Sequence, residues 1–202
     1  MLKGVETNQP RFLHLATHGL AEGGRKAYES ALALAAPEQV TADDTGFLRL
    51  ADLLYKWGGK LHGTELVTLS ACRTARGQME SGDGFVALTW GFLYAGTKGV
   101  VASLWEVDDT ATALLMSRFY ENLLGTFEQT RKMGAQAFEP GQAIPPSFAL
   151  RDAKLWLRHL TREDAMARVK DLLGDKGRVP SGENPFADPF YWGAVVLIGN
   201  SD

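Results

Sequence analysis

Cysteine is almost absent from this chain: Cys72 is the only one in 202 residues. An internal disulfide needs two cysteines, so a disulfide framework is excluded and a reducing compartment, most simply the cytoplasm, is expected. Long apolar runs are missing too, because stretches such as Gly193–Gly199 fall far short of the roughly 20 residues that span a bilayer. No charged and then apolar leader precedes the first patterned segment, so we expect neither secretion nor membrane insertion.

An excess of charge of one sign is also lacking. The chain has 21 Lys and Arg against 24 Asp and Glu, and the basic residues form no run. Direct binding to nucleic acid, which needs a basic surface, is therefore not expected. What is present is ordinary for a globular protein, with 45% hydrophobic and 22% charged residues. The length and composition predict that residues 1–202 form a single domain with one core.

The apolar and polar residues are patterned as strands alternating with helices. Four near-continuous apolar runs, typical of strands buried on both faces of a parallel sheet, are Arg11–Ala16, Leu66–Leu69, Gly99–Leu104 and Trp192–Ile198. Helical periodicity marks Gly84–Tyr94, Asp109–Leu124, Leu150–Leu160 and Arg162–Leu173. This alternation predicts a layered α/β fold. The segment 125–147, rich in Gly, Gln and Pro, predicts a flexible surface loop.

Polar residues of the types used in catalysis follow three of the predicted strands. His18 follows the first strand, Cys72 the second, and Asp108 and Asp109 the third. Because the carboxyl ends of parallel strands meet at one edge of a sheet, we expect these residues to converge there.

Cysteine and histidine at such an edge are suited to acyl transfer. A thiol is a strong nucleophile only as the thiolate, and an imidazole can take its proton and later pass it to a leaving amine. The backbone N–H groups of Gly19 and Cys72, on the predicted turns after the strands, are candidates for stabilising the oxyanion. From the residues alone, a Cys72–His18 pair and a buried cysteine with an unrelated histidine are about equally favoured.

A metal site is not expected. His14 and His18 are four residues apart, a spacing that would suggest zinc on a helix. On a strand, residues four apart lie roughly 13 Å from each other. No Glu follows His14, as the zinc-metalloprotease motif requires. We therefore predict neither a metal nor another cofactor.

Two sequence blocks carry a family resemblance. His14–Gly19 (HLATHG) and Leu66–Thr74 (LVTLSACRT) strongly resemble the signature of CHAT domains, which are cysteine peptidases of the caspase/separase type. The likeness runs from about Arg11 to the end of the chain. Later blocks that follow in the family's order are Gly82–Phe85, Phe92–Gly96, Ser103–Asp109, Phe119–Gly125, Ala149–Arg158 and Pro189–Gly199.

The resemblance implies a caspase-like, three-layer α/β/α sandwich with a mainly parallel central sheet and a catalytic dyad of His18 and Cys72. It implies a cysteine endopeptidase that cleaves protein or peptide substrates through a thioester acyl-enzyme, needs no metal, and is regulated by a sensor domain or a repeat-containing partner. Similar domains carry further strand–helix elements before the His strand, so we expect this domain to lack its N-terminal elements. The alternative is a catalytically silent CHAT-like module for protein interaction.

The resemblance also points to substrate-binding residues. In similar peptidases the strand before Asp108 walls the pocket for the residue that precedes the scissile bond, where a carboxylate would favour a basic side chain. Ser70 and Trp105 are further candidates for that wall. An Asp just before a helix is more typical of an N-cap, and Asp109 suits this role. Trp105 is also compatible with a place in the core.

Overall fold

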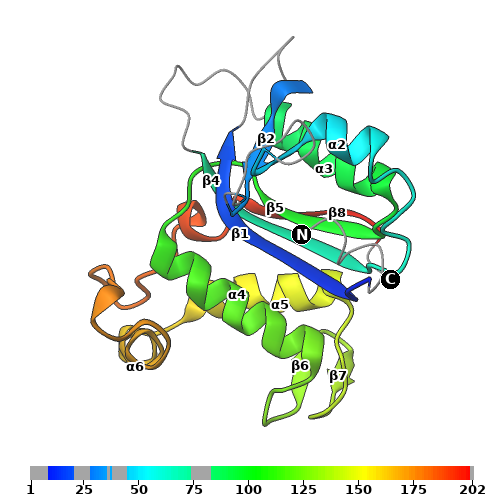
Figure 1. Cartoon of the computed structure of the whole chain (residues 1–202). Coiled ribbons are helices and arrows are strands. Elements are labelled where there is room, and N and C mark those ends of the chain that lie inside the picture. The colour runs from blue at the N-terminus through cyan, green and yellow to red at the C-terminus, as the bar shows by residue number, and fades with distance from the viewer. Residues whose placement is uncertain (1–8, 21–27, 36, 38–44, 74–82, 201–202) are drawn as a thin grey trace. The chain divides into compact units, whose positions relative to one another are not determined.

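The computed structural model describes residues 9–20, 28–35, 37, 45–73 and 83–200, with the backbone alone for residues 71–73 and 83–85 (Figure 1). The chain divides into two compact units. The first comprises Met1–Glu106 with Val195–Asn200, and the second comprises Val107–Ala194 with Ser201–Asp202. In the described part of the chain, no helix has both the length and the apolar character needed to cross a membrane.

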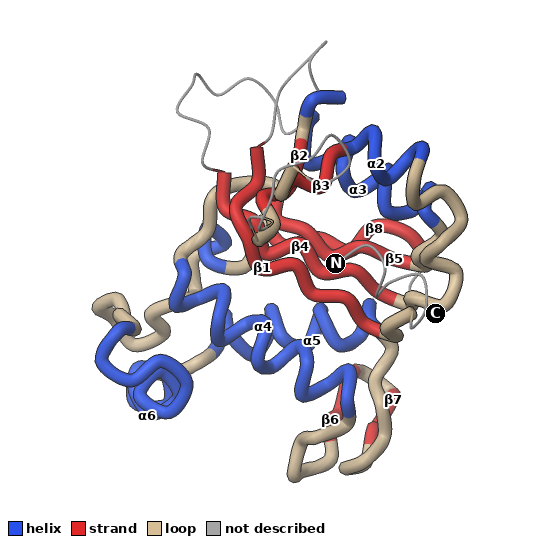
Figure 2. Tube along the Cα trace, viewed as in Figure 1, coloured by secondary structure: helices blue, strands red, loops and turns tan. Residues whose placement is uncertain are grey.

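A six-stranded sheet forms the frame of the first unit. Figure 2 draws the strands red. In chain order, the elements of this unit are β1 (Phe12–Leu20), β2 (Ala31–Ala33), β3 (Phe47–Arg49), α2 (Leu50–Tyr55), β4 (Leu66–Arg73), α3 (Asp83–Ala95), β5 (Gly99–Ser103) and β8 (Val195–Gly199). The strand order is β3-β2-β1-β4-β5-β8, and the three neighbouring strands β1, β4 and β5 are parallel. The expected α/β class, with parallel strands at the centre of the sheet, is confirmed.

The sheet differs from the sequence prediction at its edges. Strand β8 runs antiparallel to β5. The sequence pattern did not indicate this, because an apolar run does not encode strand direction. Mixed sheets often carry an antiparallel edge strand. Strands β2 and β3, of three residues each, were too short to be predicted from periodicity. Strands β1 and β4 also run further than predicted. His18, Gly19 and Cys72 therefore lie within strands rather than on the turns after them.

The core of the first unit lies between the sheet and helices α2 and α3. Successive residues of a strand point to opposite faces, and Leu15 of β1 lies on the core face. Its core neighbours include Leu53 and Trp57 from the α2 region, Val67 and Leu69 of β4, Leu88 and Phe92 of α3, and Val100 and Ala102 of β5. His14, Ala16 and His18 are exposed. Burial on both faces is therefore a wrong prediction for β1, which alternates.

The second unit consists of helices and a small hairpin. Its elements are α4 (Asp109–Leu124), β6 (Arg131–Met133), β7 (Gln136–Phe138), α5 (Pro146–His159), α6 (Arg162–Leu173) and the 3₁₀ turns Gly174–Lys176 and Pro189–Tyr191. Helix α4 packs against both α5 and α6 (Figure 1). The helices α4 and α6 have the bounds that their periodicity and capping residues predict.

Local backbone chemistry fixes both ends of α4. Asp108 is the N-cap, and Gly125 ends the helix in the left-handed conformation with φ of 68°. A Cβ at Gly125 would also lie 2.8 Å from the backbone carbons of Gly141 and Gln142, so this close approach requires glycine.

The segment 125–147 contains regular secondary structure, where the sequence predicted a flexible surface loop. It contains the antiparallel pair β6–β7 and the first residues of α5. Four apolar side chains within it are buried: Phe127, Met133, Phe138 and Ile144. Burial of these side chains stabilises a packed hairpin, which the Gly and Pro content of the segment did not indicate.

Phe92 tests the core of the first unit. Its side chain is fully buried and meets the ring of Trp57 edge-on at 6.4 Å between centroids. We expect Phe92→Ala to lower the free energy of unfolding by about 3–5 kcal/mol, because it leaves a cavity. The matched control is Tyr94→Ala on the same helix, since Tyr94 is 64% exposed. The free energy of unfolding of this variant should stay within about 0.5 kcal/mol of the wild-type value. Urea denaturation measures both, and equal losses would contradict the described core.

Candidate active site at the carboxyl end of the parallel strands

The parallel pairing of β1 with β4 brings His18 and Cys72 together. The two strands are in register from Phe12 opposite Leu66 to Gly19 opposite Arg73, and His18 lies opposite Cys72. Adjacent strands are about 4.8 Å apart, so the two backbone positions are immediate neighbours in the sheet. Figure 2 shows both strands ending at the same edge. This is the edge where the sequence pattern places the reactive residues.

The imidazole of His18 is available for chemistry. The residue is exposed, and its ring makes no hydrogen bond or ion pair to any residue that the structure describes. A neutral imidazole has one ring nitrogen that accepts a proton and one that donates it. His18 therefore has the freedom that a general base at this edge would need.

Gly19 lies inside the sheet. It is buried, and it is paired in register with Leu32 of β2 on one side and with Arg73 of β4 on the other. The sequence pattern predicted a turn here, on which the Gly19 N–H would face a substrate. The strand continues because β2 returns to pair with its last two residues, Gly19 and Leu20.

Ser70 contacts a residue that the sequence analysis did not assign to the site. His14 Nε2 and Ser70 Oγ are hydrogen-bonded at 2.8 Å. Because Ser70 lies opposite Ala16 in the register, His14 reaches it diagonally across the two strands. His14 and His18 share one face of β1, as residues four apart on a strand do. Two sequence features include His14, its four-residue spacing from His18 and its place in the His14–Gly19 block, and neither predicts a contact with Ser70.

The surroundings of the His14 ring lower its pKa. His14 is partly exposed, yet the atoms packed around it displace enough water to lower its pKa below the ordinary value. The neutral imidazole is therefore favoured at neutral pH. In this form, Nε2 either accepts a hydrogen bond from the Ser70 hydroxyl or donates one to it.

The remaining predicted substrate-binding residues lie on different units. Trp105 follows β5, two residues after Ser103, and its side chain is exposed rather than part of the core. Asp108 belongs to the second unit and caps α4. Its Oδ1 accepts a hydrogen bond of 2.8 Å from the backbone N–H of Ala111. The N-cap interpretation of Asp108 is confirmed, and Asp109 is the first residue of the helix.

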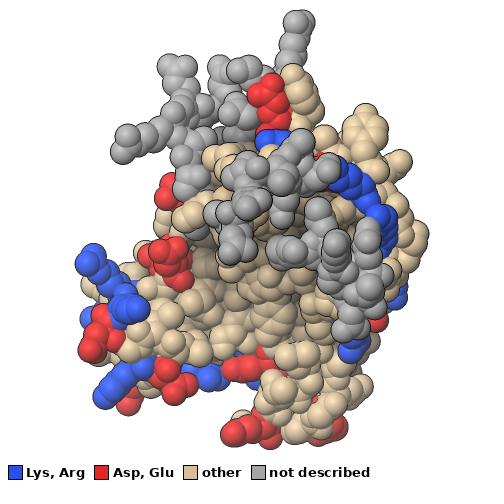
Figure 3. Space-filling view, viewed as in Figure 1, with Lys and Arg blue, Asp and Glu red and all other residues tan. Residues whose placement is uncertain are grey.

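The described residues drawn in Figure 3 carry surface charges of both signs, with Lys and Arg in blue and Asp and Glu in red. This mixture agrees with the formal net charge of −3.

Comparison with known proteins identifies related sequences. A family model described as "CHAT domain" matches residues 2–200. The mouse protein "Tetratricopeptide repeat protein 28" is 37% identical over 70 residues, which cover 35% of this chain. The match spans 3% of that relative, so the relative is far longer than this chain.

The His14 pKa predicts a pH dependence of stability. The folded chain holds this pKa below 6.5, while the unfolded chain titrates near 6.5, so the unfolded state binds more protons between these two values. The free energy of unfolding should therefore fall as the pH drops through 6.5 and level off below the folded pKa.

Urea unfolding at about pH 7.5 and about pH 5.5 measures this effect. His14→Gln should remove its part of the pH dependence. Ser70→Ala should keep that part, since burial and not the hydrogen bond lowers the pKa. Identical pH dependence in wild type and His14→Gln would contradict the prediction.

Proposed function

The chain belongs to the CHAT domain family, which is related to the caspase-like cysteine peptidases, and on this premise we propose that it is a cysteine endopeptidase. In this proposal Cys72 is the nucleophile and His18 is the general base. The observation that carries it is the register of β1 and β4, in which His18 lies opposite Cys72 at the carboxyl end of parallel strands.

The proposed reaction proceeds through a thioester. His18 accepts the proton of the Cys72 thiol, and the thiolate attacks the carbonyl carbon of the scissile peptide bond. Backbone N–H groups, for which Gly19 and Cys72 remain our candidates, stabilise the oxyanion of the tetrahedral intermediate. When the C–N bond breaks, His18 gives its proton to the leaving amine. Water, deprotonated by His18, then hydrolyses the thioester and releases the new carboxylate and the free thiol.

We place Ser70, Trp105 and Asp108 in substrate binding. The hydrogen bond between His14 and Ser70 orients the side chain of Ser70, which lies two residues before Cys72 on β4. Trp105 offers an exposed aromatic surface for a peptide. Asp108 already uses Oδ1 to cap α4, so a preference for basic residues would depend on its remaining acceptor capacity.

A repeat-containing partner is part of the proposal. The mouse relative is named for tetratricopeptide repeats and extends well beyond the matched region. We infer that this domain works with such repeats, either as a partner protein or as a joined segment, and that the repeats regulate its activity. We also place the protein in the cytoplasm, where a chain with a single cysteine stays reduced.

A catalytically silent module for protein interaction is the second candidate. The observation that favours it is the position of Gly19, which is paired on both sides within the sheet. A peptidase of the proposed kind needs an N–H directed at the substrate oxyanion. A module that only binds partners does not have this requirement.

Cleavage of a proteome-derived peptide library tests the proposal. Mass spectrometry of the new N-termini compares wild type with Cys72→Ala, His18→Ala and His14→Ala. The first two variants should lose about 100-fold or more of the cleavage rate, because they remove the nucleophile and the base. His14→Ala is the comparison variant, a histidine on the same strand; it removes only the hydrogen bond that orients Ser70 and should retain activity within about tenfold. Cleavage retained in Cys72→Ala would refute the dyad. A wild type no more active than Cys72→Ala would favour the interaction module.

A further inference from the structure

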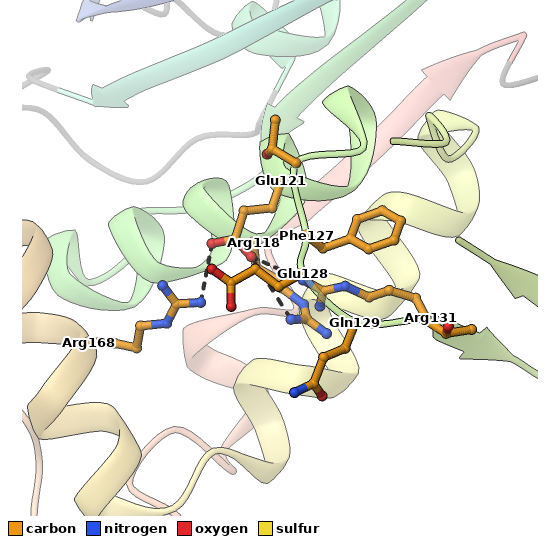
Figure 4. Close-up of a pocket in the computed structure, with 9 residues that line it drawn as sticks. Arg118, Glu121, Phe127, Glu128, Gln129, Arg131 and Arg168 are labelled. Carbon is orange, nitrogen blue, oxygen red and sulfur yellow. Dashed lines mark hydrogen bonds and ion pairs between the residues drawn. The ribbon is translucent and has the colours of Figure 1, made fainter. Parts of the chain in front are cut away.

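The second unit contains a cavity of about 510 Å³ that the proposed peptidase chemistry does not use (Figure 4). Three arginines from three different elements line it: Arg118 of α4, Arg131 of β6 and Arg168 of α6. The other lining residues are Glu121, Thr126, Phe127, Glu128, Gln129 and Thr130. All of them belong to the second unit.

The three arginines form ion pairs with only two carboxylates, those of Glu121 and Asp152. Glu121 accepts hydrogen bonds from Nη2 of Arg131 at 3.1 Å and from Nη2 of Arg168 at 3.2 Å, drawn as dashed lines in Figure 4. Arg118 donates from Nε to Asp152 at 2.9 Å, and its Nη1 lies 4.0 Å from Glu121. Three guanidinium groups are thus paired with two carboxylates, which leaves one positive charge in excess within this network.

Arg131 is the most constrained of the three. Its side chain is 9% exposed, and its guanidinium carbon lies 5.0 Å from the centre of the Phe127 ring. Its Nη1 makes no hydrogen bond to a described residue and is ion-paired only loosely with Asp152, whose Oδ2 is 3.7 Å away. A buried charged donor without an acceptor is costly. Nη1 itself has almost no exposed surface, so Arg131 contributes its charge rather than this N–H group to the cavity that it lines.

One carboxylate in the lining of the cavity does not belong to this network of ion pairs. Glu128 lines the cavity, is exposed, and forms no ion pair with any residue that the structure describes. Figure 4 shows its side chain beside those of the arginines. Its charge offsets the excess arginine charge in the cavity lining and opposes an incoming anion.

We propose that this cavity binds the phosphate group of a small phosphorylated ligand. A phosphate carries close to two negative charges and three acceptor oxygens, which suits guanidinium groups that converge from three elements. A carboxylate offers only two oxygens and one charge. The cavity has room for more than the phosphate, and Gln129 and Thr126 supply neutral polar contacts for the rest of the ligand. Bound there, the ligand bridges α4, β6 and α6, and this inference does not depend on the peptidase activity.

Titration calorimetry of the full chain with inorganic pyrophosphate tests the site. Arg168→Gln should weaken binding about tenfold, because it removes one charge-assisted donor. Arg168 is 41% exposed, so this variant leaves a solvated surface. Lys132→Gln is the matched control: it removes the same charge from an exposed residue of β6 that does not line the cavity, and should change the affinity less than about twofold. Glu128→Gln should tighten binding several-fold, since it removes the opposing carboxylate.

Three outcomes would overturn the proposal. The first is a wild type that shows no saturable binding of pyrophosphate. The second is an equal loss of affinity in Arg168→Gln and Lys132→Gln, which would mean unspecific attraction to positive charge. The third is succinate binding as tightly as pyrophosphate, which would mean that the cavity has no preference for phosphate. Tighter binding by Glu128→Gln, together with selective weakening by Arg168→Gln, would establish the site.

Discussion

The parallel pairing of β1 with β4 sets the geometry on which the proposed chemistry depends. Eight residues of each strand are in register, and this register alone decides which residue of β1 lies opposite Cys72. A slip of one residue would put Thr17 or Gly19 there instead of His18, and would turn every side chain of the slipped strand to the other face. Burial of Leu15 against α3, together with Val67 and Leu69 of β4, opposes such a slip. The core on one face thereby fixes His18 opposite Cys72 at the end of the sheet.

The fold was most predictable where the local pattern is long and periodic. Helices α4 and α6 have bounds that sequence periodicity and capping residues define, since Asp108, Gly125 and Thr161 act locally. Strand direction and the short strands β2 and β3 depend on pairing across the sheet, which apolar runs do not encode. The hairpin β6–β7 escaped prediction for a related reason: Gly and Pro indicate a turn-rich segment, but the burial of Met133 and Phe138 depends on the rest of the unit.

The candidate site also has some features that local sequence predicts and others that it does not. The placement of His18 and Cys72 near the ends of two neighbouring strands was predictable, because each belongs to a recognisable block at the end of a strand. The contact of His14 with Ser70 was not, because it is a diagonal contact between strands 56 residues apart in sequence. The arginines of the second cavity come from α4, β6 and α6, so no local motif could have grouped them. Asp108 shows that a motif position can have a structural task, capping α4, whatever its part in substrate binding.

The pH dependence of Cys72 alkylation tests the central claim most directly, because the chain has no other cysteine to react. Rates with iodoacetamide from about pH 5 to about pH 10 should give, for wild type, an apparent thiol pKa well below the ordinary value of about 8.5. In His18→Ala this pKa should return toward about 8.5, and in His14→Ala it should stay depressed. A thiol with an ordinary pKa in wild type, unchanged by loss of His18, would contradict an assembled Cys72–His18 dyad.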